Sequence, residues 1–261
     1  EVESGHLDQP SAPLAHLTRL CWARILVPPE GTAPLLRLAA AAPLLEVIEW
    51  CGNNHDPGIA AAAEGHPRLG ELQVSGKEEA WRRTIPRLPA LSSLHLRLGP
   101  DLLEEEKVEG EGGASARRLR VCGWLMHCKR LLHLHLGVSS EAHVSAHELL
   151  AAVGAAAGGR LLSLTLQYVQ PPLTRDAAAT TMHTLVASYP QREVLSLWWA
   201  FNSTEATAAQ ALSRQVLLAV PVLAPLCPAL REVRVSGSAV RLQRHPDGSV
   251  AAPKFVGSCF E

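Results

Sequence analysis

The chain has 261 residues, enough for one large domain or two small ones, and 47% of them are apolar, which excludes an intrinsically disordered protein. The 24 lysines and arginines nearly balance the 25 aspartates and glutamates. Because a net charge of −1 creates no global positive field, we expect no nucleic-acid binding.

We expect residues 1–13 to form an N-terminal tail, and residues 14–238 to contain eight copies of one short phrase. The phrase reads apolar, two variable residues, apolar, one variable residue, apolar, and its last two apolar positions have the periodicity of a strand. We therefore expect eight parallel strands whose middle apolar residues are almost fully buried. These middle residues are Leu20, Ile48, Leu72, Leu94, Leu134, Leu164, Leu195 and Val233.

Stretches of helical character precede most copies of the phrase. They cover residues 33–42, 78–87, 114–127, 145–157, 175–188 and 206–219. A unit of helix, turn, short strand and loop cannot bury its own apolar face, so each unit must stack on the next. The sequence therefore predicts an α/β solenoid, with a parallel sheet on its concave face and helices on its convex face.

Two intervals between copies are longer than the others. The first contains residues 101–113, an acidic and glycine-rich segment that we interpret as a solvated loop inserted into the solenoid. For the second we expect a longer loop at residues 202–207 together with a helix at residues 216–226 that is broken by Pro221 and Pro225.

The repeated phrase resembles the leucine-rich-repeat family in its irregular, helix-containing form. That form occurs in ribonuclease-inhibitor-like proteins and in the substrate-binding arms of F-box proteins, and it implies protein binding on the concave sheet face. The family's ninth position usually holds Asn or Cys, and only Asn53 fits here. The sequence departs from the family pattern at this position, and regular curvature is therefore not implied.

Residues 239–261 have a different pattern, and we expect them to form a C-terminal hairpin cap. Residues 240–244 and 250–255 are the two strands, joined by a His-Pro-Asp-Gly-Ser turn. Pro253 would keep the second strand at a sheet edge. A ninth, degenerate repeat is the alternative interpretation.

Candidate catalytic and metal-binding groups do not form a site in this pattern. His133 and His135 alternate with leucines on a strand, whereas His143 and His147 lie on a helix behind the sheet, so we expect no zinc site. The glutamates of residues 104–111 lie in a glycine-rich loop that cannot fix a catalytic pair. Phosphate-loop and nucleophile-elbow motifs are absent from the sequence, so we expect no enzyme, no cofactor and no small-molecule substrate.

The variable positions of the strands form columns of side chains on the open face of the expected sheet. From these columns we select nine residues as the candidate protein-binding site: Glu49, Gln73, His95, Arg97, His133, His135, Gln167, Trp198 and Arg234. Eight strands about 4.8 Å apart would span about 34 Å, which suits a protein or peptide. The alternative is a face that is merely solvated, and Trp198 is either a binding residue or covered by a neighbouring segment.

These observations predict a non-catalytic protein-interaction module, and the substrate-recognition arm of a larger protein is one form that such a module takes. The alternative is a structural subunit of a large multiprotein assembly. Six scattered cysteines without a CxxC pair predict reduced thiols and a cytoplasmic, intracellular location. The longest apolar run, residues 216–230, contains three prolines, so we expect no membrane insertion. Since the sequence begins Glu-Val-Glu, a removed targeting segment remains an alternative.

Overall fold

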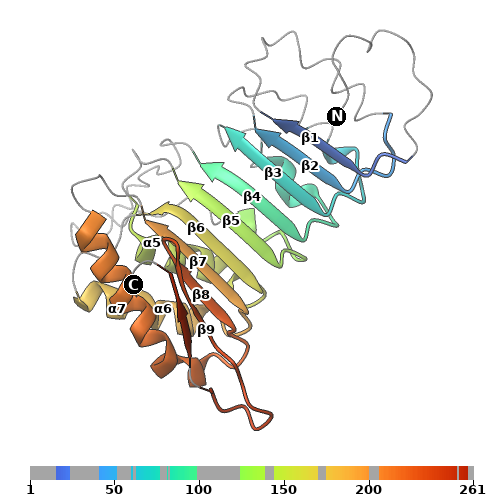
Figure 1. The fold of residues 1–261 in the computed structure, drawn as a ribbon. Coiled ribbons are helices and arrows are strands. Elements are labelled where there is room, and N and C mark those ends of the chain that lie inside the picture. The colour runs from blue at the N-terminus through green and yellow to red at the C-terminus, as the bar shows by residue number, and fades with distance from the viewer. Residues whose placement is uncertain are drawn as a thin grey trace, which may run out of the picture. The chain divides into compact units, whose positions relative to one another are not determined.

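The computed structural model describes most of the regular structure of the chain. It covers residues 16–23, 41–51, 60, 63–76, 81, 83–98, 124–138, 144–169, 175–199, 206–251 and 253–257. These residues form a mixed α/β fold with a ten-stranded sheet that does not close into a barrel (Figure 1). The chain divides into an N-terminal unit, residues 1–94 with 128–130, and a C-terminal unit, residues 95–127 with 131–261.

The N-terminal unit contains three neighbouring parallel strands. They are β1 (Arg19–Ala23), β2 (Val47–Cys51) and β3 (Glu71–Gly76). Their register aligns Leu20 with Ile48 and Ile48 with Leu72, as the repeated phrase predicts. Ile48 and Leu72 are buried, but Leu20 is only half-buried, so the expectation of nearly complete burial is wrong at the first copy.

The turn before each strand is hydrogen-bonded to the preceding turn in the same way. In the N-terminal unit, the Glu46 and Val47 N–H groups donate to Thr18 O at 2.8 and 3.0 Å, and Gly70 and Glu71 donate to Glu46 O at 2.9 and 3.0 Å. Each carbonyl thus accepts two bonds from the next copy of the phrase. The phrase therefore marks an equivalent backbone position at each of these turns.

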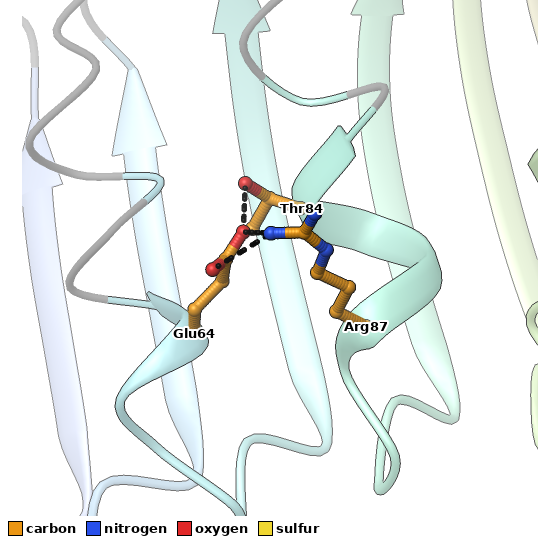
Figure 2. A network of polar contacts seen from close by, with 3 residues as sticks. All are labelled: Glu64, Thr84 and Arg87. Carbon is orange, nitrogen blue, oxygen red and sulfur yellow. Dashed lines mark hydrogen bonds and ion pairs between the residues drawn. The ribbon is translucent and has the colours of Figure 1, made fainter.

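A charged network links two successive helical segments of the N-terminal unit (Figure 2). The Thr84 hydroxyl, which is buried, donates to Glu64 Oε1 at 3.0 Å. Arg87, at the end of the short 3₁₀ helix η3 (Ile85–Arg87), donates from Nη1 to both Glu64 oxygens at 3.4 Å. Because the network joins residues about one repeat apart, it adds a polar contact to the apolar stacking.

Strand β4 (Ser93–Leu98) crosses the boundary between the units, with His95 the first residue of the C-terminal unit. That unit also contains four neighbouring parallel strands. They are β5 (His133–Val138), β6 (Ser163–Val169), β7 (Val194–Trp199) and β8 (Glu232–Val235). Their register aligns Leu134, Leu164, Leu195 and Val233, which are all buried, as is Leu94 on β4.

The turns of the C-terminal unit repeat the hydrogen bonding of the N-terminal unit. Leu162 and Ser163 donate to Leu132 O at 2.8 and 3.1 Å, and Glu193 and Val194 donate to Leu162 O at 2.8 and 3.1 Å. This recurrence is why sequence copies of unequal spacing produce strands in the same register.

Three helices gather on one side of the sheet in the C-terminal unit (Figure 1). They are α5 (Ala146–Val153), which continues as a π-helical turn η6 (Gly154–Gly158), α6 (Arg175–Ser188) and α7 (Ala206–Leu223), followed by a 3₁₀ turn η8 (Ala224–Leu226). The expected bounds of α6 are confirmed. The expected break at Pro221 is wrong, because α7 continues through Pro221, and the helical geometry changes only at η8, which contains Pro225.

The chain ends in a hairpin, as the sequence predicts. Strand β9 (Ser238–Arg241) pairs antiparallel with β8 through a tight turn at Ser236 and Gly237, which both have positive φ. Strand β10 (Lys254–Val256) then pairs antiparallel with β9. The strands are shorter than expected, and a single bridge between Arg244 and Val250 extends the pairing.

Several expected features lie outside the described residues. They are the tail 1–13, the helical stretch 33–40, the acidic insertion 101–113, most of the stretch 114–127 and the loop 202–205. In the stretch 78–87, the described residues are helical or 3₁₀ at residues 81 and 83–87. No helix among the described residues is long and apolar enough to cross a membrane.

Candidate functional site

Alternation along the strands of the C-terminal unit sends polar side chains to the side of the sheet opposite its core. On β5, Leu134 and Leu136 are buried, whereas His133 is exposed and His135 is half-buried. On β4, Leu96 is buried, while Arg97 is exposed and His95 half-buried. Because successive strand residues point to opposite faces, the histidines and Arg97 lie on the face of the sheet opposite the buried leucines.

The register of the strands then places these polar residues in rows across the sheet. One row joins His135, Thr165, Ser196 and Arg234, and the next joins Gly137, Gln167 and Trp198. We call eight of the exposed and half-buried side chains of this face the sheet-face cluster. Its members are His95, Arg97, His133, His135, Gln167, Tyr168, Trp198 and Arg234.

Two imidazoles stack at one end of the cluster. The rings of His95 and His135 have centroids 3.6 Å apart and planes that differ by 22°. Burial lowers the pKa of His135 below its ordinary value, and a hydrogen bond with Gln167 opposes this effect. Within the described residues, His135 Nε2 has no hydrogen-bond partner. The stack is therefore favoured by a neutral His135.

Arg97 contacts an aromatic ring across an intervening strand. Its guanidinium carbon lies 5.8 Å from the centroid of Tyr168 on β6, within the range of a cation–π interaction. Gly137 on β5 lies between the two strands, and a Cβ there would be in ordinary van der Waals contact, 3.7 Å from both Arg97 Cγ and Gln167 Oε1. Within the described residues, no carboxylate lies at ion-pair distance from Arg97.

Tyr168 is the member of the cluster that the sequence did not identify. Simple alternation after Leu166 would turn Tyr168 toward the core, but its φ is +61° and the register of β6 shifts between Gln167 and Val169. This irregularity leaves Tyr168 46% exposed and buries Val169 in its place. The only sequence signal is that the bulky Tyr168, which is followed by Val169, stands at the position where β5 has the buried Val138.

Trp198 is exposed, as the alternation of β7 predicts. Its side chain is 43% exposed, and its indole N–H donates to Ser196 Oγ at 3.1 Å. Ser196 is buried, although it faces the same side as Trp198. The indole thus lies along its own strand and offers a large apolar surface with its polar atom already bonded.

Arg234 closes the cluster on β8 and shares one carboxylate with a second arginine. Arg234 Nε donates to Glu232 Oε1 at 2.9 Å, and Arg241 Nε lies 3.5 Å from the same oxygen. The hydrogen bond from Arg234 is the main cause of a lowered pKa at Glu232. Two guanidinium groups therefore face one carboxylate, and positive charge remains in excess.

The remaining candidate residues belong to the N-terminal unit. Glu49 on β2 is half-buried and accepts a hydrogen bond from Arg19 on β1, and Gln73 on β3 is half-buried. Glu49 is thus engaged in an ion pair within its own sheet. The other seven candidates lie in the C-terminal unit, where His95, His135 and Gln167 are brought into contact.

The histidines considered for zinc are distributed over different elements. His133 and His135 lie on the sheet face, whereas His147 on α5 is hydrogen-bonded through Nδ1 to the Thr184 hydroxyl of α6 at 3.2 Å. His143 lies outside the described residues. Among the described residues no group of three or more His, Cys, Asp or Glu could hold a metal ion.

Comparison with protein-family models found no match, and comparisons with curated proteins and with solved structures found none either.

Proposed function

We propose that this chain is a non-catalytic protein-interaction module, an irregular leucine-rich-repeat solenoid that binds a protein or peptide through the sheet-face cluster. The observation that carries this proposal is the set of exposed side chains opposite the buried leucines, which includes Trp198, 43% exposed, and the contacting pair Arg97 and Tyr168. Trp, Tyr and Arg are the residue types that contribute most to protein interfaces. The equivalent hydrogen bonds at successive turns support the repeat interpretation.

The test begins with a binding partner isolated from the native cell and confirmed with purified proteins. Trp198→Ala and Arg97→Ala should each weaken its binding by about 2 kcal/mol, because both truncate large groups that are exposed on the face. The matched control is Arg214→Ala, an exposed arginine on α7 behind the sheet, which should change binding little. Circular dichroism of each variant should show an unchanged fold.

A second candidate function, a structural subunit of a larger assembly, is supported by an apolar stripe on the helical side. Leu218, Val222 and Leu226 follow each other at a spacing of four along α7 and η8, and they are 50%, 77% and 62% exposed. A spacing of four places them on one face of the helix. If Val222→Glu abolishes association with the isolated partner while Trp198→Ala does not, the structural-subunit function replaces the first.

A further inference from the structure

We propose that the ligand of the sheet-face cluster is an extended acidic segment, with two carboxylates about six residues apart that pair with Arg97 and Arg234. This inference rests on the proposed function and adds the chemistry of the partner. It follows from the balance of charge on the face, from the guanidinium N–H donors of Arg97, which bond to no described residue, and from the distance between the two arginines.

The charge balance is the first step. On the outward positions of β4–β9, the described residues include three arginines, Arg97, Arg234 and Arg241, and one carboxylate, Glu232. Glu232 is already shared by Arg234 and Arg241. The face is thus locally positive, although the whole chain is nearly neutral. Complementary charge is what a partner of this surface must supply.

The orientation of Arg97 is the second step. Its guanidinium rests near the ring of Tyr168, which limits the motion of the side chain without using its N–H donors. Within the described residues, these donors make no hydrogen bond to protein. A planar fork of free donors that is held in place is suited to a carboxylate, which accepts two parallel bonds.

The floor between the two ends is the third step. Arg234 ends the row of His135, Thr165 and Ser196, and His95 stacks on His135. Arg97 lies beside Gly137 in the adjacent row, which continues through Gln167 to Trp198, so side chains of both rows lie between the two arginines. These side chains are uncharged when the imidazoles are neutral, and they offer hydrogen bonds and flat surfaces. The middle of the ligand is therefore expected to be uncharged, with small, polar or β-branched side chains.

The distance sets the spacing of the carboxylates. Arg97 and Arg234 lie on β4 and β8, four strand spacings apart, which corresponds to about 19 Å. An extended chain advances about 3.3 Å per residue, so about six residues cover this distance. An even spacing also places both acidic side chains on the same side of an extended ligand.

A phage-displayed library of random decapeptides, selected on the intact chain, tests the proposal. Selection is carried out in parallel on Arg97→Ala/Arg234→Ala, and peptides that also bind this double variant are kept as a separate group. We expect the remaining peptides to be enriched in Asp or Glu pairs about six residues apart. As synthetic fluorescent peptides, they should lose about tenfold in affinity with Arg97→Ala and again with Arg234→Ala. Arg214→Ala on α7 should leave the affinity unchanged.

Gly137→Leu provides a second, independent variant, because it removes no charge. A leucine extends well beyond the Cβ position, which already contacts Arg97 Cγ at 3.7 Å, so we expect it to push the Arg97 side chain away from Tyr168. We expect it to weaken the binding of the acidic peptides as much as Arg97→Ala does. The free energy of unfolding of this variant, measured in urea, should show that the fold is retained. If Gly137→Leu and Arg97→Ala both bind the acidic peptides as tightly as the unaltered chain does, the proposal is overturned.

The outcomes separate this inference from the proposed function. Peptides that need Trp198 but contain no excess of acidic residues would overturn the acidic ligand and leave the interaction module standing. Peptides that bind equally well to Trp198→Ala and to the double arginine variant, or no enrichment at all, would contradict both. If a single-stranded oligothymidine probe displaces the selected peptides and binds more tightly than they do, the ligand is a nucleic acid and the acidic segment is rejected.

Discussion

Arg192 occupies a position that the repeated phrase reserves for an apolar residue. The side chain is only 1% exposed, its guanidinium carbon lies 5.1 Å from the ring centroid of Tyr189, and Nη1 donates to Leu185 O at 3.3 Å. Burial lowers its pKa to about 10, so it still carries its charge at neutral pH. The sequence shows the exception to the pattern, but only the ring of Tyr189 and the carbonyl of Leu185 explain how the charge is tolerated.

The first prediction compares two replacements of Arg192. Arg192→Ala leaves a cavity and should lower the free energy of unfolding by about 2–4 kcal/mol. Arg192→Leu restores the apolar pattern of the phrase and removes a buried charge, so it should cost at least about 1 kcal/mol less than alanine. Urea unfolding of both variants measures the difference. If leucine is as damaging as alanine, the guanidinium contacts are essential to the turn.

The second prediction concerns the pH dependence of stability. The folded state lowers the pKa of His135, and the groups that face it are His95 and Arg97 on β4, His133 on β5 and Gln167 on β6. The unfolded state therefore binds a proton more readily than the folded state. The contribution of neutral His135 is fully present above about pH 6.5, and it is lost as pH falls through the lower pKa of the folded state.

The measurement is the free energy of unfolding of the unaltered chain and of His135→Gln, from pH 8 to about pH 5. The unaltered chain should lose more stability on acidification than the variant does. His133→Gln, a change of an exposed histidine on the same strand, serves as the control and should keep the full pH dependence. Identical slopes for the unaltered chain and His135→Gln would show that this imidazole is not desolvated.

Outward and inward residues could be assigned from the sequence because strand alternation is a local rule. His133, His135 and Trp198 lie on the expected face for this reason. Tyr168 could not be assigned, since one residue with positive φ reverses the alternation after it. The contact of Tyr168 with Arg97 joins β6 to β4 across Gly137 on β5, so it depends on three strands and not on one.

At the scale of elements, α5 and α6 approach each other through glycine. The N-terminus of α5 is closed by a capping box of Ser145 and Glu148, and its C-terminus widens into the π-helical turn η6. A Cβ built on Gly158 in this turn would lie 2.1 Å from Ser188 O at the end of α6. Only a glycine allows the two backbones this close.

The third prediction uses this contact. Gly158→Ala should lower the free energy of unfolding by at least about 1–3 kcal/mol, because the backbone of α6 must move to admit the methyl group. Gly159→Ala, one residue further on, meets no atom within 4 Å and should change stability by less than about 0.5 kcal/mol. Thermal unfolding of the two variants distinguishes them, and similar midpoints would contradict the close packing.

Helix positions were predictable where stretches of helical character lie next to the phrase, and the bounds of α6 are those of such a stretch. The passage of α7 through Pro221 was not predictable from residue preference. Val220 and Ala224 are buried on either side of Pro221, and tertiary packing of this kind can outweigh the preference of proline against a helix interior.

At the scale of the whole molecule, the register of the parallel strands follows from the repeated phrase. The recurring turn hydrogen bonds position the starts of successive strands, so buried residues align even where the copies are 24 to 38 residues apart. The ligand was not predictable in the same way, because charge balance on the face depends on pairs such as Arg234 and Glu232 that form only in the folded chain.

The fourth prediction tests this arrangement through Leu134, a buried residue at the centre of β5. Leu134→Ala should lower the free energy of unfolding by about 2–5 kcal/mol, because it leaves a cavity among aligned leucines. Amide hydrogen exchange should increase most in β5 and β6 and least in β8, since each repeat depends mainly on its neighbours. An equal increase in all strands would indicate a globally cooperative core instead.

The final hairpin has a consequence for association between copies of the chain. The edge strand of a parallel sheet presents a row of unpaired N–H and C=O groups, and a further strand can pair with them. The tight turn at Ser236 and Gly237 reverses the direction of the chain, so β9 and β10 run against β8. The outermost strand is three residues long, includes Lys254 and follows Pro253. This end of the sheet is therefore a poor template for fibrous growth, and a concentrated solution is protected there against strand-by-strand aggregation.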